Sequence, residues 1–227
     1  VASQAGFIHV DGAAIASAYI RDLLLHDRNI TPLDMALRQA SFAAAYRTAR
    51  EGGADYFLII SVNENERDLS LKGELFVGRT GSPARTFNAF RTGPDRLRNT
   101  GRNIVDQLGA ALPFRSELAL RRAGQGLINK GRADGVKNGN VYDIVKKGRV
   151  SIKNDGIGLL YTPGDIVGTI TVSETDEEVA AGSLTRNGFY DRIEPGDEVI
   201  LQKEQTAPAP SPPAADPELR ALLRLLR

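Results

Sequence analysis

The sequence predicts an α+β fold in which an α/β sandwich domain precedes a small β-barrel. The first half of the chain shows helical apolar spacing on both sides of one continuous apolar run, residues 55–62. From about Glu117, short β-rich runs alternate with glycine-containing turns. A proline-rich segment then precedes a short amphipathic stretch. The expected domains are therefore 1–113 and 114–203, followed by a linker with a C-terminal helix, 204–227.

Composition excludes several kinds of site. The chain has 227 residues, a net charge of +1, no cysteine and two histidines, His9 and His26. Disulfides and thiolate metal sites are excluded, and a metal site built on histidine is not expected. The low net charge provides no general attraction for nucleic acid, and no apolar run approaches the roughly 18–20 residues that a membrane span needs. We expect no metal, cofactor, nucleic-acid partner or membrane span.

Three helices are predicted in the first domain. The first follows the capping residue Asp11. Its apolar residues are spread around almost the whole circumference of the helix, so the helix should be buried. The second begins at Thr31, which is followed by proline, and ends at Gly52 and Gly53. The third lies between Pro94 and Pro113 and places its aliphatic residues on one face.

Strands are predicted between these helices. The run 55–62 is typical of a central buried strand, and 69–77 alternates like a half-buried one. A third strand is expected at 86–90, and a weakly marked first strand at 7–10. We expect a sandwich with one sheet face covered by helices.

The second half has the pattern of a small barrel. Turn residues such as Asp134-Gly135 and Asn138-Gly139 separate its short apolar runs. The expected strands are 127–128, 141–145, 159–161, 166–172, 179–184 and 198–201.

Two motifs resemble known families. Residues 51–59, which contain the Gly-Ala-Asp-Tyr step into an apolar strand, resemble the signature of TolB N-terminal-like and CsgG-like envelope domains. Residues 130–139 resemble a turn in the SH3-like C-terminal barrel of the FlgT family of flagellar H-ring proteins, and 166–172 and 193–199 resemble its later strands. The resemblance implies a TolB-N-like domain followed by a FlgT-C-like barrel. It also implies a periplasmic place in a bacterial envelope assembly, without the membrane-spanning hairpins of CsgG.

No set of residues predicts catalysis. The serines at 61, 151 and 173 lack a G-x-S-x-G context, and no nucleophile is paired with a base. The acidic run 174–178 could hold a hard cation, but it lacks the spacing of an EF-hand loop and lies where a hairpin turn is expected. A solvated turn is favoured there, and a structural role for His9. We therefore expect that the chain is not an enzyme.

Local charge suggests contacts between proteins. Residues 79–149 contain fifteen Arg and Lys against five acids, whereas 174–198 contain eight acids against two arginines. Ordinary solvated loops are the favoured interpretation. The sharper hypothesis is a head-to-tail subunit contact in which a basic patch meets an acidic one and closes a ring. A second use of the basic patch is binding an anionic polymer such as nucleic acid or glycan. A leucine stripe near the C-terminus could dock in a partner's groove, fold back on its own domain or continue in a longer parent chain. The expected partner-binding residues are Arg79, Arg91, Arg96, Arg98, Glu174, Asp176, Glu177, Glu178, Leu219, Leu222, Leu223 and Leu226.

These patterns predict a non-enzymatic structural or adaptor protein of a bacterial envelope machine. The resemblance narrows the expectation to a flagellar motor or basal-body ring. The alternative is a periplasmic protein that binds glycan or another ligand in its barrel or interdomain cleft. Glycan binding commonly needs aromatic platforms, and the absence of tryptophan, with only six tyrosines, favours scaffolding.

Overall fold

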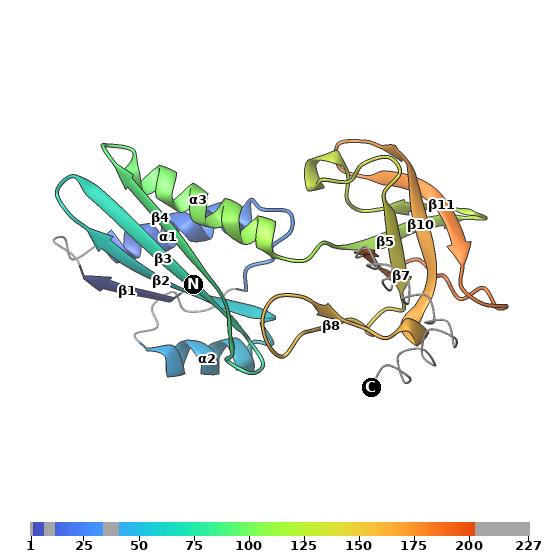
Figure 1. Cartoon of the computed structure of the whole chain (residues 1–227), viewed down its shortest axis with the longest axis horizontal. Helices are drawn as coiled ribbons and strands as arrows, with labels where there is room; N and C mark the ends of the chain where they lie inside the picture. Colours follow the sequence, from blue (N-terminus) through green and yellow to red (C-terminus); the bar gives the residue numbers. More distant parts are fainter. Residues whose placement is uncertain (1, 7–11, 34–40, 203–227) are drawn as a thin grey trace, which may run out of the picture.

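The structure, a computed structural model, describes residues 2–6, 12–33 and 41–202, with side chains described from residue 14. Within these ranges the chain forms an α/β domain and a separate β-barrel, joined by the short connection 112–114 (Figure 1). Each domain has its own hydrophobic core, and the two core clusters share no residue. The predicted succession of an α/β domain and a small barrel is confirmed.

A four-stranded sheet organises the first domain. The strand order is β1-β2-β3-β4, with β1 parallel to β2 and the other pairs antiparallel. The first strand lies earlier than the predicted 7–10, and residues 7–11 are outside the described part of the chain. The strands are β1 (Ala2–Gly6), β2 (Tyr56–Glu64), β3 (Asp68–Val77) and β4 (Pro83–Thr92).

Helices cover both faces of this sheet, which corrects the prediction of one covered face. Because successive strand side chains point to opposite faces, β2 serves two clusters. Leu58 and Ile60 pack with helices α1 (Gly12–Leu25) and α3 (Arg96–Ala111). Phe57 and Ile59 pack on the other face with Ala45 of helix α2 (Phe42–Glu51), which lies below the sheet in Figure 1.

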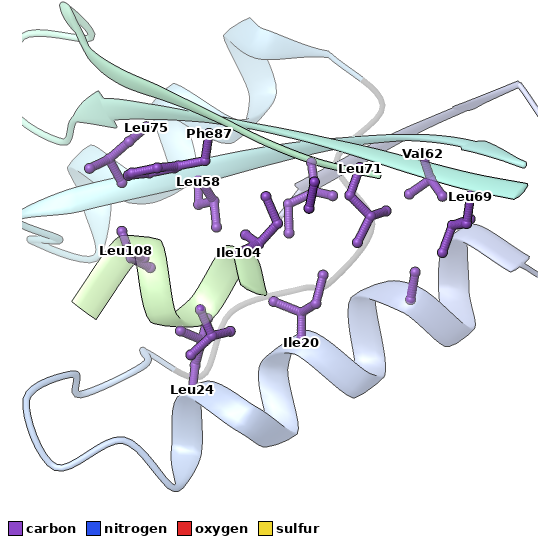
Figure 2. Close-up of a cluster of buried hydrophobic side chains, with 14 residues drawn as sticks. Ile20, Leu24, Leu58, Val62, Leu69, Leu71, Leu75, Phe87, Ile104 and Leu108 are labelled. Carbon is purple, nitrogen blue, oxygen red and sulfur yellow. The ribbon is translucent and has the colours of Figure 1, made fainter. Parts of the chain in front are cut away.

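The larger cluster holds the α/β domain together. Figure 2 shows Ile20 and Leu24 of α1 and Ile104 and Leu108 of α3 pointing at the apolar face of the sheet. Phe87, 2% exposed, lies among them. Removing a buried side chain of this size would leave a cavity, so this layer contributes much of the domain's stability.

Two helices differ from their predicted form. The first is amphipathic rather than buried all round, because Ile15 and Leu25 are more than half exposed. The second begins at Phe42, where the side chain of Ser41 accepts a hydrogen bond from the amide of Ala44. Residues 31–33 are not helical, and 34–40 lie outside the described ranges, so the predicted start at Thr31 is wrong. The end at Gly52 is confirmed, and Gly53 adopts a φ of +66° there.

The second domain is a closed six-stranded barrel with the order β10-β11-β6-β5-β12-β7. A separate two-stranded sheet, β8 (Ser151–Ile152) with β9 (Leu159–Leu160), lies in the excursion between β7 and β10. The barrel strands are β5 (Arg115–Arg122), β6 (Gln125–Ile128), β7 (Val141–Val145), β10 (Ile166–Thr175), β11 (Ala180–Arg186) and β12 (Glu198–Leu201).

Strand β5 was not predicted, although it bonds to both β6 and β12. Three arginines dominate its sequence, and Leu118 is its one large apolar residue that is buried in the barrel core. Local spacing therefore gave no period-2 signal, and barrel closure supplies the partners that hold it extended.

Candidate interaction surfaces

The four arginines of the predicted basic face do not lie together. Arg79 follows the end of β3 nearest the barrel, whereas Arg91 lies at the end of β4 that pairs with the start of β3. The length of a ten-residue strand, roughly 30 Å, separates these two ends of the sheet. Arg96 and Arg98 lie in the first turn of α3, at the same end of the sheet as Arg91.

Each of these arginines has a partner within the chain. Arg96 pairs with Glu64 at 2.7 Å, and both side chains are mostly buried. Arg91 donates to the carbonyl of Phe90 at 2.7 Å. Arg98 lies 3.9 Å from Asp95, and Arg79 donates to the side chain of Asn154.

The predicted acidic hairpin is the turn between β10 and β11, and part of it is engaged inside the molecule. Glu177 pairs with Arg132 at 2.8 Å, and Glu178 pairs with Arg28 of the α/β domain at 3.3 Å. The carbonyls of Asp176 and Glu177 accept from the amides of Arg132 and Ala133 at 2.8 and 3.0 Å. Glu174 is exposed on β10 near this turn.

Gly131 permits the hairpin to approach this closely. A methyl group added at Gly131 would lie 2.5 Å from the carbonyl oxygen of Asp176 and 2.6 Å from the amide nitrogen of Val179. Both atoms belong to the backbone, which cannot move aside cheaply. The glycine in the 130–139 motif is therefore required by packing against the hairpin.

Lys130 connects the two domains. Its side chain is almost fully buried, and its ammonium donates to the carbonyl of Arg28 at 3.3 Å and to the side chain of Asn29. The ammonium also lies 3.6 Å from a carboxylate oxygen of Asp134 and 6.0 Å from the ring centre of Phe114. With this many partners, the buried side chain of Lys130 fixes the position of the loop that carries it.

The β7–β10 excursion makes a second connection. The backbone carbonyl of Asn154 accepts from the hydroxyl of Thr80 at 2.8 Å. The amide of Gly158 donates to the hydroxyl of Tyr56 at 3.3 Å, and Ile157 packs against the α/β core. Figure 1 shows this excursion reaching from the barrel to the end of the sheet.

A cleft of about 570 Å³ lies between the domains. Its lining is largely aliphatic and includes Leu24, Leu58, Leu108 and Leu159. Four cations line it with one acid, but each cation has a partner within the chain. The lining charges are Arg21, Arg28, Arg115, Lys130 and Asp55.

A buried acid lies in the barrel wall. Asp143 on β7 is 6% exposed, and the hydroxyl of Tyr161 donates to its Oδ2 at 3.1 Å. Burial raises the pKa of Asp143, and the hydrogen bond from Tyr161 opposes that rise. Burial, together with the charge of Asp143 and the hydrogen bond to it, raises the pKa of Tyr161 to about 12. Neither residue lines the interdomain cleft.

The most exposed large apolar side chains of the described residues are a pair that sequence reasoning missed. Phe189 and Tyr190, in the loop between β11 and β12, are 84% and 75% exposed. Their ring centres are 5.1 Å apart in an edge-on arrangement. Two aromatic residues inside a segment of Asn, Gly, Asp and Arg were the available signal, since such a loop offers no apolar spacing to bury them.

The remaining predictions concern metal ligands, the two histidines, the C-terminal leucines and membrane spans. Among the described residues, no group of His, Asp and Glu is arranged to hold a metal ion. Nδ1 of His26, just past the end of α1, lies 2.7 Å from the carbonyl oxygen of Asp22. His9 and the leucines at 219, 222, 223 and 226 lie outside the described ranges. None of the helices described is long and apolar enough to cross a membrane.

Comparisons with known proteins give limited matches. Residues 1–110 match a family model described as a second domain, TPASS_0648_2nd. The C-terminal domain of LpoB from Salmonella enterica is similar to part of the chain, with 18% identity and a TM-score of 0.34. That match covers 41% of this chain and 78% of the LpoB domain. No curated protein sequence matches. Function must therefore be inferred from the residues of this chain.

Proposed function

We propose that this chain is a non-enzymatic adaptor that works through protein–protein contacts in a bacterial envelope assembly. The observation that carries the proposal is the exposed pair Phe189 and Tyr190. Large aromatic side chains held in water on a monomer are a recurrent mark of protein interfaces. The charged residues predicted to bind partners, Arg79, Arg91, Arg96, Arg98, Glu177 and Glu178, each have a partner within the chain, so this pair is the clearer interface candidate.

The connection between the domains supports an adaptor role. Lys130, the Arg28–Glu178 pair and the Gly158–Tyr56 hydrogen bond all join the barrel to the α/β domain. A platform built in this way presents surfaces of both domains in one geometry. Preorganised surfaces lose less conformational entropy when they bind.

The envelope location is supported by the two motifs. The Gly-Ala-Asp-Tyr step leads directly into β2, and the 130–139 motif forms the turn that receives the β10–β11 hairpin. TolB-N-like and FlgT-C-like or SH3-like identities for the two domains, a periplasmic location and a flagellar ring are the narrower forms of the proposal. They stand on the sequence resemblance.

The absence of enzymatic activity is part of the proposal. The buried acid Asp143 lies in the barrel wall, away from the cleft. Tyr56 does line the cleft, and burial raises its pKa, while its hydroxyl accepts from the amide of Gly158. A structural hydrogen bond accounts for that hydroxyl.

Ligand binding in the cleft is the less favoured candidate. The aromatic residues in its lining are Tyr56 and Phe57, and both are partly buried. Phe57 stacks on Phe76 with ring centres 5.2 Å apart, and Tyr56 packs against the α/β core. Neither presents the open ring face on which a sugar would stack.

The proposal is tested by capture from envelope extracts of the source organism. The full chain, carrying a cleavable tag, is crosslinked in the extract and its partners are identified by mass spectrometry. We expect a small, saturable set of envelope proteins whose capture is competed by untagged chain. Capture that never saturates, or of cytoplasmic proteins alone, would contradict the proposal. Flagellar rod, ring or stator proteins in the set would support the narrower assignment.

Two companion measurements test the other predictions. Deleting residues 206–227 should lower capture if the leucine stripe docks on a partner, and an unchanged yield counts against that docking. Light scattering at low and high salt tests the ring, because head-to-tail contacts between charged patches should weaken as salt rises. A particle of the same mass at both salt concentrations would oppose the ring.

A further inference from the structure

The loop that carries Phe189 and Tyr190 is anchored at both ends. At its start, the amide of Asn187 donates to the carbonyl of Val167 at 2.9 Å, and its side-chain amide donates to the carbonyl of Ile166 at 3.1 Å. At its end, Ile193 is buried in the barrel core. Only five residues, 188–192, lie between these anchors, so the loop has few conformations to choose from.

An ion pair braces the middle of the loop. Arg121, in the β5–β6 hairpin, donates two hydrogen bonds to the carboxylate of Asp191. Nη1 lies 2.8 Å from Oδ1, and Nη2 bonds to Oδ2. Oδ1 of Asp191 also accepts from the amide of Ile193 at 3.3 Å. The hydrogen bond from Arg121 holds the pKa of Asp191 below its usual range, so the brace persists into acidic solution.

The braced loop holds Phe189 and Tyr190 exposed, although among the described residues their rings make an aromatic contact only with each other. Leaving such side chains in water forgoes the favourable free energy of burying their apolar surface. A loop could avoid that cost by folding its rings onto the barrel, but the anchors at Asn187 and Ile193 hold this one outward. The rings contact each other edge-on, as aromatic pairs prefer.

The loop that carries the pair and the neighbouring β5–β6 turn are positively charged, and the Nζ atom of Lys146 donates to the carbonyl of Arg192 at 3.4 Å. The segments 121–124 and 186–193 hold four arginines, one acid and no lysine. Arg186 lies near enough to Asp191 to lower the pKa of that carboxyl, and Arg192 is exposed beside it. Phenylalanine, tyrosine and arginine are enriched in protein interfaces, whereas lysine is depleted.

Building on the adaptor function, we propose that Phe189 and Tyr190 insert into an apolar pocket of a folded protein partner whose rim carries carboxylates. The two rings supply the buried centre of the interface. The arginines supply the complementary rim and accelerate encounter with an acidic surface.

A second copy of this chain fits the site less well. Its acidic hairpin is the natural complement to arginines, but the carboxylates of Glu177 and Glu178 already pair with Arg132 and Arg28. The C-terminal residues 216–227 carry three arginines against two acids, so their charge does not complement this rim. A membrane surface would receive only two rings and no lysine from this loop.

The test places a photo-crosslinking benzoylphenylalanine at position 190 of the full chain. After irradiation in envelope extract, mass spectrometry identifies the crosslinked peptide. We expect a peptide of a different protein, in a region whose neighbouring surface contains several Asp or Glu side chains. A crosslink to a second copy, to residues 216–227 or to lipid would overturn the proposal.

Variants quantify the contribution of each part. The double variant Phe189→Ser, Tyr190→Ser should lower capture of that partner about tenfold or more, the effect of removing a buried aromatic anchor. The pair Arg186→Glu, Arg192→Glu should lower capture at low salt and reduce its salt dependence. The matched control is Phe90→Ser, because Phe90 is a half-exposed phenylalanine on β4 of the other domain.

The outcomes separate this inference from the adaptor function. If wild-type chain captures envelope proteins and the double serine variant captures them equally, the aromatic site is refuted and the adaptor function stands. If wild-type chain captures none saturably, the adaptor function fails. Binding of wild-type chain, and not of the double variant, to vesicles of phosphatidylglycerol and phosphatidylethanolamine would assign the rings to membrane and overturn the proposal. Equal melting temperatures of variant and wild type establish that the exposed loop was altered without unfolding.

Discussion

Replacing Tyr161 by phenylalanine removes one hydroxyl from a buried pair and should destabilise the barrel. The hydroxyl donates to Oδ2 of Asp143 at 3.1 Å, and Asp143 is 6% exposed. Removing the hydrogen-bond donor of a buried carboxylate lowers the free energy of unfolding by about 1–3 kcal/mol. We expect Tyr161→Phe to lower the free energy of unfolding by that amount at pH 7.

The same pair predicts how this difference changes with alkaline pH. The pKa of Tyr161 is about 12 in the folded chain, compared with an ordinary value of 10.0. Because the folded value is the higher one, the unfolded chain loses this proton first, and wild type loses stability as pH rises from 10 towards 12. Each pKa unit corresponds to about 1.4 kcal/mol, so wild type should lose about 2 kcal/mol by pH 12. Phenylalanine has no proton to lose.

The assay is urea unfolding followed by circular dichroism at intervals from pH 7 to 12. The stability advantage of wild type over Tyr161→Phe should shrink by about 2 kcal/mol across the alkaline range. The control Tyr190→Phe removes an exposed hydroxyl and should match wild type throughout. An advantage that stays constant from pH 8 to 12 would refute the assignment of the raised pKa to Tyr161.

Three further substitutions test other contacts. Gly131→Ala should lower the free energy of unfolding by about 1–3 kcal/mol, because the methyl group overpacks against the hairpin backbone. Gly124→Ala, with open space around the added methyl, should lower it by under about 1 kcal/mol. Equal melting temperatures of the two variants would refute the close approach at Gly131. Phe87→Ala should cost about 3–5 kcal/mol in chemical denaturation, and Phe90→Ala in the same strand much less, because the first is buried and the second half exposed. Burial raises the folded pKa of Asp143 above its ordinary value of 3.8, so wild type should lose stability as pH rises above that value. Asp143→Asn should therefore gain stability relative to wild type as pH rises from 3.8, and melting profiles that stay parallel would contradict this.

Much of the fold could be predicted because its signals are local. The apolar run at 55–62 became β2, the prolines at 94 and 113 bracket α3, and Gly52 ends α2. In each case the spacing of apolar residues or the backbone preference of one residue decides the element. The glycine turns of the second half likewise separate the barrel strands that were expected.

The missed elements depend on distant partners. Strand β5 is held extended by β6 and β12 rather than by its own arginine-rich sequence. Helix α2 begins at Phe42, ten residues after the proline that suggested its start. The ring of Phe42 packs against Phe76 of the sheet. Nothing in the local pattern of either segment indicates these contacts.

The candidate site was predictable only in part. The acidic run 174–178 ends strand β10 and enters the expected hairpin turn, yet the pairing of Glu177 with Arg132 and of Glu178 with Arg28 could not be read from the sequence. Those arginines come from distant parts of the chain, and the pair with Arg28 also depends on where the two domains meet. The aromatic pair was overlooked because phenylalanine and tyrosine in a sequence are more often buried than exposed.

The sequence by itself determined the succession of a mixed α/β region and a β-rich barrel, because helix and strand periods are properties of neighbouring residues. The tertiary structure alone decided which side chains remain available to a partner. Exposure is set by long-range contacts: Ile193 is buried by the barrel core and Asn187 is bonded to β10, so the two rings between them remain in solvent. The carboxylates of Glu177 and Glu178, which look free in the sequence, are paired for the same reason.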